Sequence, residues 1–406
     1  MPQSVAFYTN AMKENYGPGL RNAVNNNNVV WGEVATNTAD IIGTEAVWSI
    51  HTGRSSSTSA RKELVAPATA DRQKFQKARR GLASIYHTVK ISGQVRHLTS
   101  GNEGAFASSL DTEVKGADKD LKNEMARETF GQGVSIGGVI YPGIMATLSA
   151  DPGTGTTLTM AAEDSSIMRH FFIGMKLDVL AQGSGAVVQA GLEVTAINVA
   201  ARTLTIGVAA DAAIASGDFI CRTGNFDAEI DGLRFLLGTQ TYAGINPATV
   251  PAWQAVQVGS TTTGISEVLL DEAIEGVQTD GDGSTPELFI CEHKQRRKLA
   301  SMLQAQKRYE GREMTLTSGW KGLALSQGVL VADRYCPTTR IFGLTKTEMQ
   351  RFVGLDFQWD EDDDGGVFYK ALDGTDATEA RFKGYTQLAT VNRNSHVQIR
   401  VAEPTF

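Results

Sequence analysis

The chain has 406 residues, of which 41% are hydrophobic and 20% are charged. This ordinary globular composition excludes a collagen-like, coiled-coil or wholly disordered chain. At ~100–200 residues per domain it predicts two to four packed units. The net charge of −7 argues against a dedicated DNA-binding protein, whose affinity depends on clustered Lys and Arg.

The charges are unevenly distributed. Segment 54–80 holds eight basic residues against two acids, and segment 356–379 holds nine acids against one Lys. The basic side chains are Arg54, Arg61, Lys62, Arg72, Lys74, Lys77, Arg79 and Arg80. The acidic run contains Asp360, Glu361, Asp362, Asp363 and Asp364. Opposite charges on two segments of one chain favour an electrostatic contact between neighbouring copies.

The N-terminal hundred residues predict extended structure. Residues 1–42 are polar and rich in Asn without a persistent period, which predicts an arm that orders on a neighbour or stays disordered. Alternating apolar and polar residues predict strands at 44–52 and 84–95. We expect these strands to pair as a long ribbon with a polar, basic tip. A two-stranded ribbon is barely stable alone, and nearby sequence offers it no apolar support.

Residues 103–130 predict one long amphipathic helix. Its apolar residues recur every three or four positions, which places them on one stripe; they are Phe106, Leu110, Val114, Ala117, Leu121 and Met125. Asn102 is a suitable N-cap, and Gly131 is suited to follow the last turn. At ~1.5 Å per residue the helix spans roughly 40 Å.

The rest of the chain divides into two patterns. Six short alternating runs between 145 and 224, separated by Gly, Asp and Ser, predict a small inserted barrel or sandwich. From residue 226 onward, helices and strands mix. The predicted helices cover 265–277 and 292–308, and the predicted strands cover 286–291, 328–332, 340–344, 380–391 and 396–402.

Motifs for catalysis and metal binding are weak. Gly133 to Gly137 matches G-x-S-x-G around Ser135, but it follows a predicted helix and enters Gly-rich chain, whereas a hydrolase elbow joins a strand to a helix. A hinge or loop is the favoured interpretation. Asp360 to Gly365 resembles the start of a calcium loop, yet Ala371 stands where a bidentate Glu is needed. We favour an acidic, solvated turn that contacts a neighbour.

Other site types are also unsupported. The six His residues lack ligand spacing for zinc, and no Walker loop occurs. The three Cys residues are far apart and predict buried thiols. The sequence therefore predicts no catalytic, cofactor or metal site. Helix 292–308 is basic, which leaves nucleic-acid contact open beside a solvated helix face. No signal peptide is visible at residues 1–10, and the Gly-rich stretch 129–150 does not predict a membrane helix.

The order of these elements resembles the major capsid protein of tailed double-stranded DNA bacteriophages, the Hong Kong 97-type family. The similarity rests on the run from His87 to Val95 that leads into Gly104 to Leu110, on Asp231 to Arg234, and on Gly244 to Asn246 with Trp253. The main support for this similarity is the order of the elements along the chain, which is arm, hairpin, long helix, insertion and acidic turn. The resemblance implies an α+β fold with an N-arm, an extended E-loop, a P-domain with a long spine helix, and an A-domain.

The resemblance also implies the domain division. The expected parts are an N-arm at 1–42, an E-loop at 43–100, the P-domain with the spine helix at 101–139, an inserted β-domain at 140–225, an A-domain at 226–345, P-domain return strands with the acidic loop at 346–392, and a C-terminal A-domain strand at 393–406. The basic E-loop tip and the acidic loop are the expected contacts between subunits.

Such subunits form hexamers and pentamers that build an icosahedral shell around double-stranded DNA. The expected partners are therefore other copies of the chain, with scaffolding, portal and decoration proteins and DNA bound without sequence specificity. Assembly is expected in the cytoplasm of the host bacterium, with no membrane involved. A hydrolase acting through Ser135 and a nucleic-acid module using helix 292–308 remain the alternatives.

Overall fold

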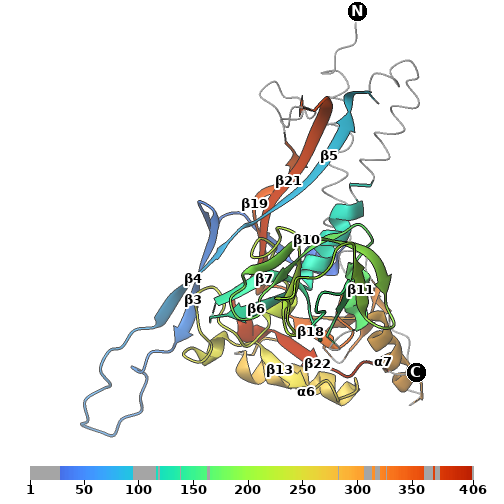
Figure 1. The fold of residues 1–406 in the computed structure, drawn as a ribbon. Coiled ribbons are helices and arrows are strands. Elements are labelled where there is room, and N and C mark those ends of the chain that lie inside the picture. Colours follow the sequence, from blue (N-terminus) through green and yellow to red (C-terminus); the bar gives the residue numbers. More distant parts are fainter. Residues whose placement is uncertain are drawn as a thin grey trace, which may run out of the picture.

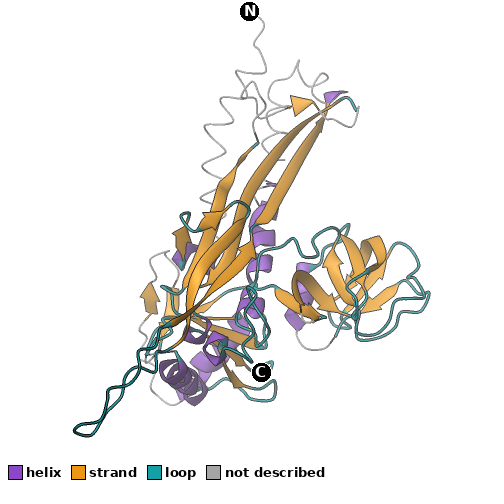
Figure 2. Cartoon of the chain, turned by 90° about the vertical axis from the view of Figure 1, so that its left-hand side faces the viewer, coloured by secondary structure: helices purple, strands orange, loops and turns teal. Residues whose placement is uncertain are grey.

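The computed structural model describes residues 28–94, 116–117, 119–137, 139–161, 165–281, 283–305, 313–315, 321–325, 327–360, 369–370 and 375–404. Within these ranges, no helix is both long enough and apolar enough to cross a membrane. The chain has an elongated form, with a long sheet above a mixed base and a ribbon that projects from one side (Figure 1). A separate β-domain lies beside this body (Figure 2).

The long sheet is built from strands far apart in the sequence. Its strands are β1 (Ala35–Asn37), β5 (Ala83–Ser92), β19 (Met349–Trp359), β20 (Tyr369–Lys370) and β21 (Ala377–Thr390). The central strand β21 pairs antiparallel with β19 and with β5, and β1 joins β19 in parallel. At ~3.4 Å per residue, β21 alone extends roughly 45 Å.

A helix at 119–129 runs beside this sheet. Leu121 and Met125, from the predicted stripe, are buried in the main core. Phe106, Leu110 and Val114 lie outside the described residues.

The β-domain has its own core. Its strands are β6 (Gln132–Ile136), β7 (Val139–Thr147), β8 (Thr157–Thr159), β9 (Lys176–Leu180), β10 (Val187–Asn198), β11 (Thr203–Ile206) and β12 (Phe219–Arg222), with the 3₁₀ helix η1 at Ser165–His170. They pair antiparallel in the order β6-β7-β12-β9-β10-β11-β8. Leu177, Leu204 and Ile220 are fully buried among its core residues. All six runs predicted here fall on strands, and β6 adds a strand where we expected a flexible connection.

The base is a mixed sheet with short helices. Its strands follow the order β13 (Val256–Gly259), β22 (Val397–Arg400), β18 (Arg340–Leu344), β14 (Leu288–Cys291), β17 (Val329–Ala332), β16 (Lys321–Ala324) and β15 (Glu313–Thr315). The helices are α5 (Leu233–Leu236), η2 (Pro251–Trp253), α6 (Glu267–Asp280), α7 (His293–Ala305) and η3 (Arg393–Ser395). Alternate residues of β14 face opposite cores: Phe289 packs with α6 and α7, whereas Ile290 packs with the main body.

The strand pairing at the ribbon differs from the prediction. Strand β3 (Glu45–Gly53) pairs with β4 (Lys74–Gly81) and with the short β2 (Ile41–Ile42), whereas β5 pairs with β21. The expected pairing of 44–52 with 84–95 is therefore wrong. Two strands of similar alternation are available to several partners, and the basic segment 74–81 takes the position beside β3 although only Ala78 in it is buried.

Residues 28–42 also pack on their own chain, which corrects the prediction of an arm without local structure there. Helix α2 (Val29–Glu33) buries Val29, Val30 and Trp31. The Trp31 indole and the Asn28 amide both donate to the Thr129 hydroxyl, each at 2.7 Å. One apolar tripeptide is thus enough to dock this segment, because tertiary contacts rather than periodicity stabilise so short a helix. Residues 1–27 lie outside the described part.

His396 lies in the turn that returns the chain from β21 to β22, and it is fully buried. The Thr345 amide donates to its Nδ1 at 3.1 Å, and the Thr390 hydroxyl lies 2.9 Å from Nε2. Burial, helped by the nearby Arg393 charge, lowers the pKa of His396 to about 3. The folded protein therefore holds this imidazole neutral with its proton on Nε2.

We predict that His396 makes the fold sensitive to acid. Because its folded pKa lies below the unfolded value of 6.5, its contribution is complete above pH 6.5 and is lost as the pH falls toward 3. The loss approaches ~1.4 kcal/mol per pH unit. Urea unfolding of the wild type and of His396→Gln at pH 7.5 and pH 5 measures it. The wild type should lose more stability than the variant between these values; equal losses would contradict the assignment.

Candidate functional site

The ribbon is the most protruding feature of the described chain. Strands β3 and β4 pair from Glu45 opposite Gly81 to Gly53 opposite Lys74. We call loop 54–73, which joins them, the tip; it extends away from both the base and the β-domain (Figures 1 and 2). Of the eight predicted basic contact residues, Arg54, Arg61, Lys62 and Arg72 are in the tip and the other four are on β4.

Hydrogen bonds within the tip give it a defined shape. Asp71 accepts the amide and the hydroxyl of Ser56, each at 2.9 Å, so it joins the two sides of the loop. These bonds, together with the Arg72 amide, lower the pKa of Asp71. At the apex the Val65 amide donates to the Lys62 carbonyl at 3.3 Å.

The apex presents an apolar residue among cations. Leu64 is fully exposed and has a left-handed backbone with φ of +63°, and Val65 is half exposed. Arg61 and Lys62 beside them are also exposed. Single exposed apolar residues are common on protein surfaces, so it is the projection of this apex from the body that makes it a candidate contact.

The base of the ribbon packs on its own chain. Trp48 stacks on Phe352 of β19, with ring centroids 5.3 Å apart and planes at 24°. Ala46, Ile50 and Ala78 are buried with it. The expectation that the ribbon has no apolar support is therefore wrong for its base, and only the tip extends without such packing.

Arg80 joins the ribbon to two other parts of the fold. Its guanidinium forms two hydrogen bonds to Asp231, of 2.7 and 2.8 Å, and lies 5.6 Å from the centre of the Phe235 ring. The Asp231 amide donates to the Gln387 side chain at 2.7 Å, and Gln387 donates to the Gly81 carbonyl at 3.0 Å. Strand β4, the start of α5 and strand β21 therefore meet in one network.

The acidic member of this network is buried, and the basic member is partly exposed. Asp231 is fully buried, whereas the Arg80 side chain is 23% exposed. Burial raises the pKa of Asp231 to about 6 although Arg80 opposes the shift, and Asp231 in turn raises the pKa of Arg80. The two short bonds to Arg80 keep Asp231 ionised and paired at neutral pH.

Gly232 allows the close approach that this network needs. A Cβ atom built at this position would lie 2.3 Å from the Gly131 nitrogen and 2.6 Å from the Glu128 carbonyl oxygen. A side chain at residue 232 would therefore push α5 away from the end of helix 119–129. Sequence reasoning noted 231–234 only as part of the resemblance and did not identify Asp231 or Gln387 as partners of Arg80.

The predicted basic residues divide into two groups. Arg80 has its partner within the chain, and Arg79 lies 3.6 Å from Glu45 across the ribbon. Lys74 and Lys77 are exposed on β4. Arg80, predicted as a contact between subunits, is thus paired within its own chain. Charge alone does not distinguish such an anchor from a surface cation.

The described part of the acidic segment is partly neutralised within the chain. Asp360 accepts a bond from Lys383 of β21 at 2.5 Å, and Lys90 of β5 lies 3.5 Å from Glu379. Donating this bond to Asp360 raises the pKa of Lys383. Glu361, Asp362, Asp363 and Asp364 lie outside the described residues, so their contact with a neighbour stays a prediction.

A buried acidic cluster lies at the end of helix 119–129. Carboxylate oxygens of Glu124, Glu128 and Glu229 lie within 4.8 Å of one another. Arg127 donates to Glu124 at 2.8 Å and also to Glu229, and Arg222 lies 3.1 Å from Glu124. Despite burial, these guanidinium groups lower the pKa of Glu124 to about 2. The cluster is an ion-pair network in which Arg side chains supply the positive charge.

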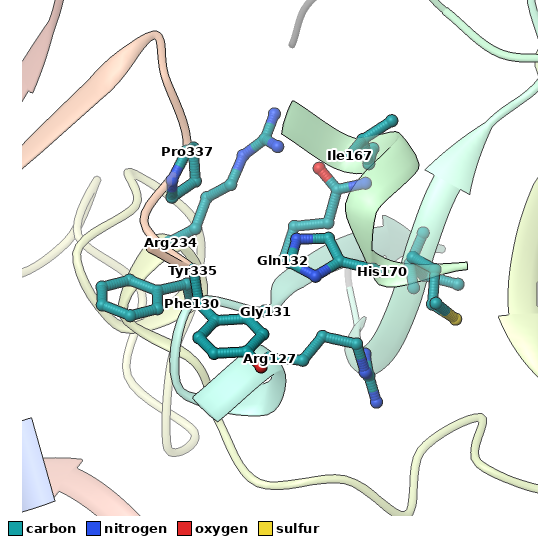
Figure 3. A pocket seen from close by; sticks show the side chains of 11 residues that line it. Arg127, Phe130, Gly131, Gln132, Ile167, His170, Arg234, Tyr335 and Pro337 are labelled. Atoms are coloured by element: carbon teal, nitrogen blue, oxygen red, sulfur yellow. The ribbon is translucent and has the colours of Figure 1, made fainter. Parts of the chain in front are cut away.

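The geometry does not support the hydrolase alternative. Ser135 lies within β6 and pairs with Ile140 across a hairpin, so it lacks the strand-to-helix turn that exposes a nucleophile. A nearby cavity, lined by Arg127, His170 and Tyr335 among others, measures about 40 Å³ (Figure 3). This volume suits one or two water molecules, whereas ligand pockets span ~300–1,000 Å³.

The Cys residues fit the expectation of buried thiols. Cys221, Cys291 and Cys336 are all buried, and none of them forms a disulfide bond. Burial raises the pKa of Cys221 to about 12 and raises that of Cys291 as well. Neither thiol forms the thiolate that a reactive cysteine needs at neutral pH.

We predict that Asp231→Ala loosens the ribbon. It removes the partner of Arg80, and we expect a loss of ~1–3 kcal/mol of stability, since Arg80 is partly exposed and can reach solvent. Limited trypsin digestion should cut faster near Lys74 and Lys77. The matched control is Arg79→Ala, whose exposed pair is worth ~0–1 kcal/mol. Equal effects of the two variants would show that the network does not hold the ribbon.

No protein-family model and no curated protein matches the sequence. Among solved structures, the capsid asymmetric unit of cyanophage A-1(L) is similar over 92% of this chain and 92% of that chain, with 11% identity and a TM-score of 0.54. The holo-SrpI encapsulin complex from Synechococcus elongatus PCC 7942 covers 93% of this chain and 89% of that chain, at 9% identity and a TM-score of 0.45. The cyanophage similarity carries the assignment: this chain has the Hong Kong 97-type capsid fold.

Proposed function

We propose that this chain is the major capsid protein of a tailed double-stranded DNA bacteriophage. Copies of it assemble into hexamers and pentamers, which form an icosahedral shell and place the chain in the virion. The observation that carries the proposal is a capsid fold over nearly the whole chain combined with a ribbon whose tip extends beyond its own core.

The tip supports assembly with other copies. Its apex combines exposed Leu64 with Arg61 and Lys62, a pairing of apolar and charged groups that is typical of protein contacts. A projecting tip and the surface that receives it are different parts of one chain. The contact is therefore head-to-tail, and such contacts close into rings when the rotation between copies allows it.

Further partners belong to the same proposal. These partners are packaged DNA, bound without sequence specificity, and scaffolding, portal and decoration proteins. We also propose that assembly takes place in the host cytoplasm. A net charge of −7 per chain suits a container for DNA, because a strongly cationic wall would bind the genome and resist its release. The proposed role is structural, since Ser135 lies within a paired strand and lacks the strand-to-helix turn that exposes a nucleophile.

Electron microscopy of the purified, full-length protein tests the proposal directly. Shells, capsomers or tubes are the expected particles. A solitary monomer at all protein concentrations would overturn it. Nucleic-acid binding by an isolated monomer would instead favour the module that uses the basic helix α7.

We predict that the tip is needed for assembly but not for folding. Replacing 54–73 by a two-residue Asn-Gly turn preserves the pairing of β3 with β4 and the Arg80 network, because Gly53 and Lys74 already lie opposite each other. The variant should keep the circular dichroism spectrum and unfolding midpoint of the wild type and form no shells.

Leu64→Ser is the matched point variant. It changes a side chain that is fully exposed in one chain, so stability should change by less than ~0.5 kcal/mol, whereas shell yield should fall. Normal assembly by the shortened variant would exclude the tip as a contact between subunits.

A further inference from the structure

Two helices on one face of the base sheet carry opposite charges. Helix α6 contains five acids and no Lys or Arg, and α7 contains four Lys or Arg and no acid. The acids are Glu267, Asp271, Glu272, Glu275 and Asp280, and the cations are Lys294, Arg296, Arg297 and Lys298. Single-signed helices on one small domain are unusual for a surface that only faces solvent, where mixed charges are the norm.

The fold holds these helices at separate places. Helix α6 packs on β13 and β22 at one edge of the sheet, and α7 packs on β17 toward the other edge. Leu270 and Leu299 anchor them in the same core, so their charged sides face outward. Figure 1 shows α6 along the lower side of the base and α7 at the C-terminal side.

A groove of about 530 Å³ lies beside α7. Its lining includes Lys294 of α7 with Arg169 and Arg202 of the β-domain, against one acid, Glu403. Lys294 lies 3.6 Å from Glu403, and Arg169 lies 3.5 Å from Glu292. The three cations still outnumber these two acids, so the groove keeps a net positive charge. Val199, 61% exposed, adds an apolar side chain to the lining.

The outer face of α6 has the complementary composition. Glu272 and Glu275 are exposed on it, and Val268 between the acids is 76% exposed. The exposed Val268 among the acids of α6 thus has a counterpart in the exposed Val199 among the cations of the groove. Charge complementarity of this kind selects partner and register.

We propose that α6 of one copy docks in the groove beside α7 of the next copy. The inference rests on the proposed function and names a second contact between subunits, separate from the ribbon tip. Because both surfaces occur on every chain, the contact is head-to-tail and repeats around a ring. It joins the β-domain, through Arg169 and Arg202, to the neighbouring copy.

A charge-exchange experiment tests the proposal. Glu272→Lys with Glu275→Lys replaces two exposed acids of α6 by cations, and Arg202→Glu with Lys294→Glu leaves the groove lining with more acids than cations. Each variant alone should remain monomeric in sedimentation velocity at low salt. An equimolar mixture should regain oligomers, since each copy then meets a neighbour of opposite charge. High salt should weaken the wild-type oligomer, because the Debye length falls from ~10 Å at 0.1 M to ~3 Å at 1 M.

Glu193→Lys with Asp151→Lys is the control, because it reverses two exposed acids of the β-domain; it should assemble like the wild type. Normal oligomers from both helix variants would overturn the docking of α6 while leaving the capsid proposal intact, whereas a monomeric wild type would overturn the capsid proposal itself. Normal oligomers of the Arg202→Glu, Lys294→Glu variant that bind less DNA than the wild type would assign the groove to nucleic acid and also overturn the proposal.

Discussion

The ion pair between Arg80 and Asp231 fixes the ribbon relative to the rest of the molecule. A ribbon of two strands has little stability alone, so its direction depends on what holds its base. Two charge-assisted bonds and the stacking of Trp48 on Phe352 hold it from two sides. Gln387 extends the connection to β21. The tip is therefore held in a set direction in the single chain, and in the proposed contact between copies this would reduce the conformational entropy lost on binding.

The sequence predicted the elements with strong local signals. The strands of the β-domain were predictable because they alternate in polarity and Gly, Asp or Ser lies between most of them, and α6 was predictable from its amphipathic pattern. Pairing was not predictable at the ribbon, since Ile85 and Val89 of β5 alternate in a way that suits any partner. Strand β4 offered almost no apolar pattern. Strand β4 pairs with β3 because the tip connects the two strands in the chain. Its single buried residue, Ala78, forms no apolar pattern that would predict a strand.

The sequence predicted the exposed basic residues of the tip, but it did not predict the ion pair between Arg80 and Asp231 that anchors the ribbon. Clustered charge identified the exposed Arg54, Arg61 and Lys62, because exposure and charge go together. The same rule placed Arg80 with them, although its partner Asp231 lies 151 positions away in the chain. A buried ion pair requires both members to be brought together by the fold, and neither member alone differs from a surface charge. The local sign of a packed junction is Gly232, which directly follows Asp231 and has no room for a side chain.

The proposed contacts of the tip and of α6 constrain each other. Both are head-to-tail, so one rotation between neighbouring copies must satisfy both. The tip is held through Arg80 to the start of α5 and to β21 of the long sheet, and α6 is packed on the base sheet through Leu270. The main core contains residues of both sheets and joins them. A rigid connection between them means that a shift at one contact misaligns the other. Each contact alone is weak, because exposed charges are screened by salt. Two weak contacts on one rigid body add their free energies for the correct rotation only, and this selects closed rings over irregular aggregates.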